Sequence, residues 1–265
     1  MNRIVARFSQ LQQQGQKGFV VYIGAGDPDL EATLRLALAF DRLGVDVLEL
    51  GVPFSDPLAD GLVNQLAAQR GLASGTTPAK VLESVRAIRK GSEIPIVLYI
   101  YFNLIHRFGL AAFVREAAAA GVDGLLVLDL PPEEAGPYQQ CMNAAGLSAI
   151  YLVAPTTPPD RIALIVKQAS GFIYYVSREG VTGMQESVAG NISEMIAQIR
   201  SHTQLPVAVG FGISTPKQAR LVAENADAIV VGSAVVNQIA RFGQTPELVE
   251  RVSDFVRPLI EAIRT

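Results

Sequence analysis

Two carboxylates that flank one loop, Glu49 and Asp60, are the side chains of this chain best placed for acid–base chemistry. Glu49 lies near the end of the apolar segment 45–50, which is typical of a short buried strand. Asp60 ends the loop that follows, and segment 48–61 as a whole reads LELGVPFSDPLADG. An isolated buried carboxylate is costly unless it is paired or hydrogen-bonded. A glutamate in a strand, followed by a carboxylate on the next loop, therefore indicates a site for proton transfer.

Each of these residues also has a purely structural explanation. Glu49 could be an interior carboxylate that is satisfied by a hydroxyl or an amide. Asp60 precedes Gly61, and Asp-Gly is a common turn pair. Tyr174, on a later apolar segment, is by itself more often a packing residue than a catalytic one. Only the combination of the two carboxylates favours chemistry.

Eight short apolar segments alternate with helical patterns along the chain. Fully apolar strands of this length are typical of a parallel sheet covered on both faces. Eight strand–helix units in 265 residues predict a single (β/α)8 TIM barrel of the α/β class, with an extra N-terminal helix at 2–14 and one domain over 1–265. A doubly wound sheet is the alternative, but it usually has fewer strands and a recognisable switch-point motif. The predicted strands lie at 19–23, 45–50, 96–101, 124–129, 149–153, 172–176, 207–211 and 228–232.

The predicted barrel determines which side chains face its interior. Working groups in such barrels lie at the carboxyl ends of the strands and in the loops that follow. Alternation along a strand directs Glu49 into the interior and its neighbours Leu48 and Leu50 toward the outer helices. The same rule predicts Tyr174 inside and Tyr175 outside. Among the predicted helices are 62–73, 132–145 and 191–201, and one helix is expected from the eighth strand to Arg264.

Glycine-rich loops follow the last two predicted strands. They read GFGIS at 210–214 and GS at 232–233, and GVTG at 180–183 could contribute. In (β/α)8 barrels these loops bind phosphate, because glycine lets backbone N–H groups approach the anion and a helix N-terminus supplies positive potential. Glycine turns required only by barrel geometry are the alternative. With the carboxylates, the loops indicate a lyase or isomerase acting on a phosphorylated small molecule, without a metal or redox cofactor.

Composition and charge exclude several classes of function. The net charge is −3 and no basic stripe is visible, which argues against a nucleic-acid partner. The single cysteine, Cys141, excludes an internal disulfide framework, and His106 and His202 lack a metal-ligand pattern. No segment has the run of about 18 apolar residues that spans a membrane, and the N-terminus lacks the apolar region of a signal peptide. We expect a cytoplasmic protein without membrane partners.

The segment 48–61 closely resembles the signature of the tryptophan synthase alpha subunit family. SREGVTG at 177–183, GFGIS at 210–214 and VVGSAVV at 230–236 match that family in order and spacing, as do GDPD at 26–29 and the Tyr101–Asn103 pair. Asp129 at a strand end also matches, and the resemblance covers the whole chain. It implies a lyase of tryptophan biosynthesis that splits indole-3-glycerol phosphate into indole and glyceraldehyde 3-phosphate, a retro-aldol cleavage.

The resemblance also implies a role for each site residue. Glu49 would deliver a proton to indole C3 and take one from the glycerol hydroxyl, and Asp60 would hold the indole N–H and stabilise the positive charge on the ring. Tyr174 would orient the reacting hydroxyl or Glu49. Loop 178–190 would close over the substrate, with Thr182 contacting Asp60. The implied ring pocket consists of Tyr22, Ile100 and Phe211, and the implied phosphate site of Gly183, Gly212, Gly232 and Ser233.

A protein partner follows from the resemblance as well. The family pairs with a β subunit in an α2β2 assembly, and that subunit carries pyridoxal phosphate and receives indole through a tunnel. This chain would contact it through loop 53–60 and the region around Asn103 and Leu104, and would hold no cofactor of its own. No lysine lies at a pocket-lining strand end. The sequence departs from the common family pattern at Tyr22, Gly24, Leu62 and Asn64, which bears on affinity and β-subunit coupling more than on the reaction.

Two other functions stay open at this point. One is a catalytically weak activating partner of the β subunit, against which the retained pair of Glu49 and Asp60 argues. The other is a different phosphate-binding barrel, such as a sugar-phosphate isomerase, which predicts no indole formation. An assay of indole release with Glu49→Gln separates an enzyme from an activator, because only the enzyme depends on this side chain.

Overall fold

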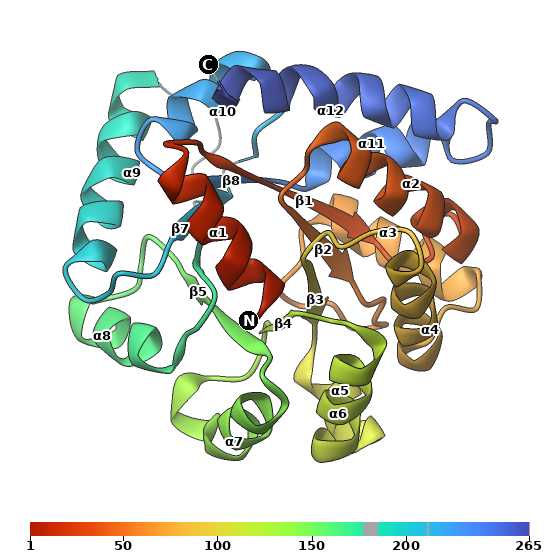
Figure 1. Cartoon of the computed structure of the whole chain (residues 1–265), viewed down its shortest axis with the longest axis horizontal. Helices are drawn as coiled ribbons and strands as arrows, with labels where there is room; N and C mark the ends of the chain where they lie inside the picture. The colour runs from red at the N-terminus through yellow and green to blue at the C-terminus, as the bar shows by residue number, and fades with distance from the viewer. Residues whose placement is uncertain (177–184, 211, 265) are drawn as a thin grey trace.

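The computed structural model describes residues 1–176, 185–210 and 212–264, and for 185–191 it describes the helix but not the side chains. Within these ranges, parallel strands close into a barrel in the order β1 to β8 (Figure 1). Closure is direct, because β1 pairs with β2 on one side and with β8 on the other. The predicted α/β barrel is therefore confirmed. The strands are β1 (Gly18–Gly24), β2 (Val47–Gly51), β3 (Ile96–Ile100), β4 (Gly124–Val127), β5 (Ser148–Val153), β6 (Ile173–Val176), β7 (Val207–Gly210) and β8 (Ala228–Val231).

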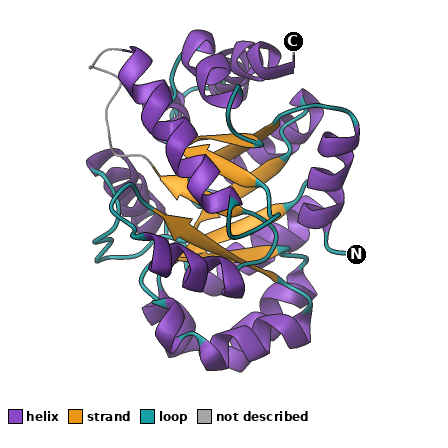
Figure 2. Cartoon of the chain, turned by 90° about the vertical axis from the view of Figure 1, so that its left-hand side faces the viewer, coloured by secondary structure: helices purple, strands orange, loops and turns teal. Residues whose placement is uncertain are grey.

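Helices surround the barrel, as Figures 1 and 2 show. The extra N-terminal helix α1 (Arg3–Gln13) crosses one end of it. Among the described residues, no helix is both long and apolar enough to cross a bilayer. The helices of the ring are α2 (Leu30–Leu43), α3 (Leu62–Ala73), α4 (Pro78–Arg89), α5 (Phe102–Phe108), α6 (Leu110–Ala120), α7 (Gly136–Ala145), α8 (Pro159–Gln168), α9 (Gln185–Arg200), α10 (Pro216–Ala223), α11 (Ser233–Phe242) and α12 (Leu248–Arg264).

Several predicted helices differ from the observed ones. The predicted helix 132–145 is divided into the short 3-10 helix η1 (Pro132–Glu134) and α7, because Pro137 has no N–H to continue a helix and instead starts a new one. The single helix expected to reach Arg264 is two helices, α11 and α12. The turn between them is fixed by Thr245, whose N–H and hydroxyl both donate to the Phe242 carbonyl. Helix α9 begins six residues earlier than 191, at Gln185, and α5 was not predicted.

The strands separate an inner core from an outer core. Leu48, Leu50 and Tyr175 pack in the outer core, between the barrel and its helices. Val47 is part of the inner core and Tyr174 packs against it, so the predicted alternation along β2 and β6 is confirmed. The inner core is closed at one end by apolar side chains of α1. Its buried members are Ile4, Phe8, Leu11, Val20, Val47, Val97, Leu126, Ile150, Phe172, Ala208, Ala228 and Val230.

Three aspartates fix the amino-terminal end of the barrel, which we call the base. Asp46, Asp123 and Asp227 are the residues directly before β2, β4 and β8, respectively. Each carboxylate accepts a backbone N–H from the strand before it, namely from Phe19 at 2.6 Å, from Ile96 at 2.8 Å and from Val207 at 2.8 Å. These hydrogen bonds connect neighbouring strands at the base, which is the end of the barrel opposite the rim where the working groups are expected.

Candidate active site

Glu49 occupies the interior of the barrel on β2, on the same face as Val47. Its side chain is buried, and its Oε1 has no hydrogen-bond partner among the described residues. Burial raises the pKa of Glu49 to about 8, and the negative charge of Asp60 contributes to the rise. The Glu49 carboxyl group is therefore largely protonated at neutral pH and can act as a proton donor.

Asp60 is held by two phenols at the end of β3. The hydroxyl of Tyr99 donates to Oδ1 of Asp60 at 2.7 Å, and the hydroxyl of Tyr101 donates to Oδ2 at 2.8 Å. Tyr101 in turn accepts the N–H of Ala59 at 3.0 Å. Burial and the Asp60 carboxylate raise the pKa of both tyrosines, so both remain donors. The second carboxylate of the predicted pair thus lies in a defined hydrogen-bonded position.

Tyr22 lies beside this pair on the inner face of β1, opposite Glu49 in the strand register. Its ring meets that of Tyr99 edge-on, with centroids 5.0 Å apart and planes at 69°. Burial raises the pKa of the Tyr22 hydroxyl well above its usual value, and the Asp60 and Glu49 charges add to the shift. A small cavity adjoins these aromatic rings and is lined by Gly24, Gly51, Val52, Pro53, Phe54, Pro57, Asp60, Ala68 and Tyr101 in addition to Tyr22 and Tyr99.

One expected member of the ring pocket is elsewhere. Ile100 packs in the outer core, between the barrel and the helices, so the expectation that it lines the pocket is wrong. Strand alternation explains the error, because Val97 and Tyr99 share the inner face of β3 and Ile100 lies on the other. Tyr99 is the site residue that the sequence reasoning missed. The same parity rule that placed Glu49 inside would have identified it.

Tyr174 reaches the interior from β6, across the barrel from β2. Burial raises the pKa of its hydroxyl well above the usual value, and the next cause is the charge of Glu49. The phenol has room because the neighbouring strand carries Gly210, where an added Cβ would lie only 2.7 Å from the hydroxyl oxygen of Tyr174. The structure thus places Tyr174 close enough to Glu49 for the Glu49 charge to affect its pKa.

The glycine loops expected to bind phosphate lie at the adjacent ends of β7 and β8, which pair directly. Gly212 has a φ of +63°, a backbone conformation that favours glycine. Gly232 is the N-cap of α11, whose first residue is Ser233, so the N-terminus of that helix lies directly after this loop. A Cβ at Gly232 would lie 3.4 Å from Cβ of Tyr22, which places the loop next to the ring pocket. Three expected site residues lie outside the described residues, namely Thr182, Gly183 and Phe211.

Other polar groups near the site add detail. The Oδ1 atom of Asn64, on the first turn of α3, is buried without a hydrogen-bond partner in the described part of the chain. Asp129, at the end of β4, accepts the N–H of Phe102 at 2.6 Å and so positions the start of α5. Over the described residues, no group of three or more His, Cys, Asp or Glu side chains is arranged to hold a metal ion.

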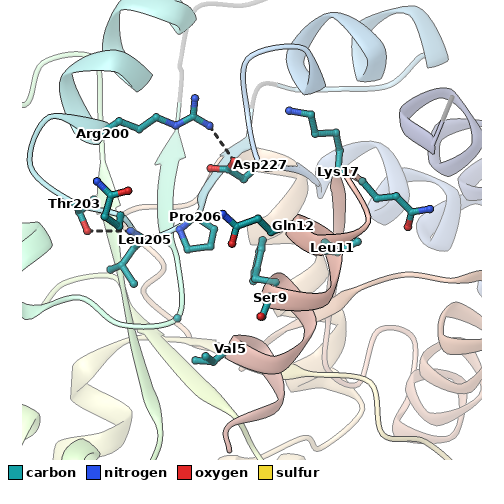
Figure 3. Close-up of a pocket in the computed structure, with 15 residues that line it drawn as sticks. Val5, Ser9, Leu11, Gln12, Lys17, Arg200, Thr203, Leu205, Pro206 and Asp227 are labelled. Atoms are coloured by element: carbon teal, nitrogen blue, oxygen red, sulfur yellow. Dashed lines mark hydrogen bonds and ion pairs between the residues drawn. The ribbon is translucent and has the colours of Figure 1, made fainter.

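A wider groove of about 580 Å³ lies at the base, beside α1 (Figure 3). Its cationic side chains already have partners. Lys17 donates to the carbonyl of Ala226 at 2.8 Å, and Arg200 pairs with Asp227 at 2.9 Å. Barrel enzymes work at the opposite rim, so we assign the chemistry to the cluster around Glu49 and Asp60.

Comparisons with known proteins identify the family of this chain. Residues 8–264 match the family model described as "Tryptophan synthase alpha chain". The chain is 57% identical to the tryptophan synthase alpha chain of Opitutus terrae over 93% of each chain, and 49% identical to that of Geobacter sulfurreducens over 99% of each.

Solved structures give the same result. The alpha subunit of tryptophan synthase from Legionella pneumophila is similar with a TM-score of 0.92 and 38% identity, covering 99% of this chain and 98% of that one. A structure of Mycobacterium tuberculosis tryptophan synthase is similar with a TM-score of 0.90 and 32% identity, covering 100% and 99%. The chain belongs to the tryptophan synthase alpha chain family.

Proposed function

We propose that this chain is the lyase that cleaves indole-3-glycerol phosphate into indole and glyceraldehyde 3-phosphate in tryptophan biosynthesis, with Glu49 and Asp60 as its working groups. The observation that carries the proposal is the state of Glu49. It is a buried glutamate whose pKa is raised to about 8, with one oxygen that has no hydrogen-bond partner among the described residues, next to a carboxylate held by two phenols. A family lyase that must protonate carbon requires such a proton donor.

Glu49 supports both proton transfers of the reaction. Its proton adds to C3 of the indole, which moves the ring double bond and leaves positive charge on the ring nitrogen. The resulting Glu49 carboxylate then takes the proton of the hydroxyl on the adjoining side-chain carbon. As that O–H bond breaks, a C=O bond forms, the C–C bond to C3 breaks, and its electron pair returns to the ring and neutralises the nitrogen. The products are indole and the aldehyde.

Asp60 supplies the electrostatic part of the mechanism. Its carboxylate accepts the indole N–H and stabilises the positive charge that develops there in the transition state, where such stabilisation accelerates the reaction most. Tyr22 and Tyr99 provide aromatic surface against the ring, and Tyr174 orients Glu49 or the reacting hydroxyl. We assign the phosphate to Gly183, Gly212, Gly232 and Ser233, and add Thr182 and Phe211 to the substrate contacts.

We further propose that a tryptophan synthase β subunit binds at the rim next to the site. Leu58 and Leu62 are large apolar residues that are 94% and 69% exposed, and Leu66 is 43% exposed one turn further along α3. Exposed apolar groups gathered in one region are typical of interaction surfaces. Loop 53–60 and the exposed Asn103 form this face, in an α2β2 assembly whose pyridoxal phosphate belongs to the partner. A cytoplasmic location stays a prediction.

The decisive experiment follows indole release from indole-3-glycerol phosphate, with and without a β subunit. The wild-type chain should form indole, and Glu49→Gln should lose at least about 100-fold in kcat, the loss typical of a removed acid–base group. Glu224→Gln is the matched control, because Glu224 is an exposed glutamate on the outer helix layer. Unchanged activity of Glu49→Gln would identify an activating subunit, and the absence of indole with wild type would favour another phosphate-binding barrel.

A further inference from the structure

We propose that Tyr99 is a positioning residue of the reaction, which holds the Asp60 carboxylate in the orientation that receives the indole N–H. The inference rests on the proposed function and deepens it at the same site. Its basis is the hydrogen bond of 2.7 Å that the Tyr99 hydroxyl donates to Oδ1 of Asp60. Tyr99 lies on the inner face of β3.

Asp60 needs such support because its own segment is poorly packed. Around it, Ser55, Asp56 and Ala59 are exposed, and Leu58 is 94% exposed. Tyr99, by contrast, lies on β3, whose backbone is paired with strands on both sides. A catalytic side chain on a loop gains precision when groups on rigid elements hold it. A strand residue therefore fixes a carboxylate that its own loop would leave free to turn.

Tyr101 alone does not fix the plane of the carboxylate. It donates to Oδ2, and a single bond to one oxygen leaves the group able to rotate about its Cβ–Cγ bond. The bond from Tyr99 to the other oxygen removes that freedom. An ionised carboxylate has about four lone-pair sites, so two phenol donors still leave acceptor capacity for the indole N–H.

The Tyr99 hydroxyl and ring have separable roles. The ring packs edge-on against Tyr22 at 5.0 Å, a contact that phenylalanine would preserve. The hydroxyl donates to Asp60, and burial raises the pKa of Tyr99 well above its usual value, which keeps the proton on the phenol. Tyr99→Phe thus removes the positioning bond and retains the aromatic surface.

A double-mutant cycle tests this role, using kcat and KM for indole formation from the full chain with its β subunit. The variants are Tyr99→Phe, Asp60→Asn and the double variant. Tyr99→Phe should lower kcat roughly tenfold, as expected for a hydrogen bond to a charged group, while KM changes less than about twofold. In the Asp60→Asn background the same substitution should change kcat by less than about twofold, because the positioned charge is already absent.

The control is Tyr138→Phe, which removes another buried phenol, one that contacts the Leu125 carbonyl at 3.5 Å in the outer core. It should leave kcat unchanged. The proposal is overturned if Tyr99→Phe leaves kcat unchanged or raises it, or if it causes the same loss with and without Asp60. Binding of indole-3-glycerol phosphate to Glu49→Gln, measured by calorimetry, tests the proposed function separately, because a chain that binds no substrate fails before positioning matters.

Discussion

Glu49 and Asp60 share one site but have opposite surroundings. Each oxygen of Asp60 accepts a phenol hydroxyl, whereas Oε1 of Glu49 has no partner in the described part of the chain. Burial, assisted by the Asp60 charge, raises the pKa of Glu49 to about 8. Two carboxylates in different environments can therefore divide the work, one as proton donor and the other as a fixed negative charge.

This division predicts the pH dependence of the reaction. Because the free enzyme must begin with protonated Glu49, kcat/KM for indole formation should fall as the pH rises through about 8. Asp60→Asn removes the smaller of the two causes of the shift, so in that variant the fall should occur at lower pH. Rate measurements from pH 6 to pH 10 check both points. A profile that is flat across pH 8, or a limb that Asp60→Asn moves upward, would contradict the assignment.

The same pKa predicts how stability depends on pH. Between about pH 4.5 and pH 8 the unfolded Glu49 carboxyl is ionised, while the folded one keeps its proton, so a rise in pH favours unfolding. Glu49→Gln removes this titration. As the pH rises through this window, the free energy of unfolding of Glu49→Gln should increase relative to that of wild type by up to roughly 4 kcal/mol. The difference should become constant above about pH 8.

Urea unfolding at pH 5, pH 6.5 and pH 8 measures the difference between Glu49→Gln and wild type. The exposed Glu224→Gln serves as the control, and its difference from wild type should not change with pH. A Glu49→Gln difference that is constant from pH 5 to pH 8 would show that the Glu49 pKa is not raised in the folded chain.

The sequence predicts the barrel and the position of Glu49 well, because both depend on local periodicity. Apolar runs mark the strands, and alternation along β2 separates Glu49 from Leu48. The Asp60 environment was harder to predict, because Tyr99 and Tyr101 reach it from another strand, and only the closed barrel brings them together. The resemblance assigned Ile100 to the ring pocket, but the neighbouring Tyr99 lies there. An error of one residue in a strand moves the assignment to the opposite face of the sheet.

Gly51 illustrates a site requirement that sequence alone does not reveal. An added Cβ at this position would lie 2.8 Å from Cζ of the Tyr22 ring and closer still to its hydroxyl. Gly51→Ala should therefore displace Tyr22, destabilise the fold by about 1–3 kcal/mol as overpacking does, and raise KM for the substrate. Gly61→Ala, at the N-cap of α3, is the control, because nothing lies within 4 Å of its added Cβ.

Steady-state kinetics and urea unfolding of both variants decide the matter. The effect should be confined to Gly51→Ala, with Gly61→Ala close to wild type in both measurements. If the two variants behave alike, the space at Gly51 does not serve to hold Tyr22 in place.

Substitution of Asp123 tests whether the base can be destabilised without a change in the activity of the site. Its buried carboxylate accepts the N–H of Ile96 at 2.8 Å and pairs with Arg3 at 3.1 Å and with Arg89 at 2.8 Å. The Arg89 side chain is only 11% exposed, and its burial lowers its pKa, an effect that Asp123 partly offsets. Asp123→Ala should cost at least about 3 kcal/mol in the free energy of unfolding, because it leaves the largely buried Arg89 cation without its carboxylate partner.

Asp227→Ala is the matched comparison, since Asp227 makes the equivalent bond to Val207 but is 37% exposed and pairs with an exposed Arg200. Its loss should be about 1 kcal/mol, because solvent replaces much of the interaction. Both aspartates lie at the base, opposite the catalytic rim, so kcat/KM per folded molecule should stay at the wild-type value in each variant. Denaturant unfolding combined with indole-release kinetics tests this. A fall in kcat/KM at temperatures where the variants are folded would show that the aspartate hydrogen bonds at the base control the geometry of Glu49 and Asp60 directly.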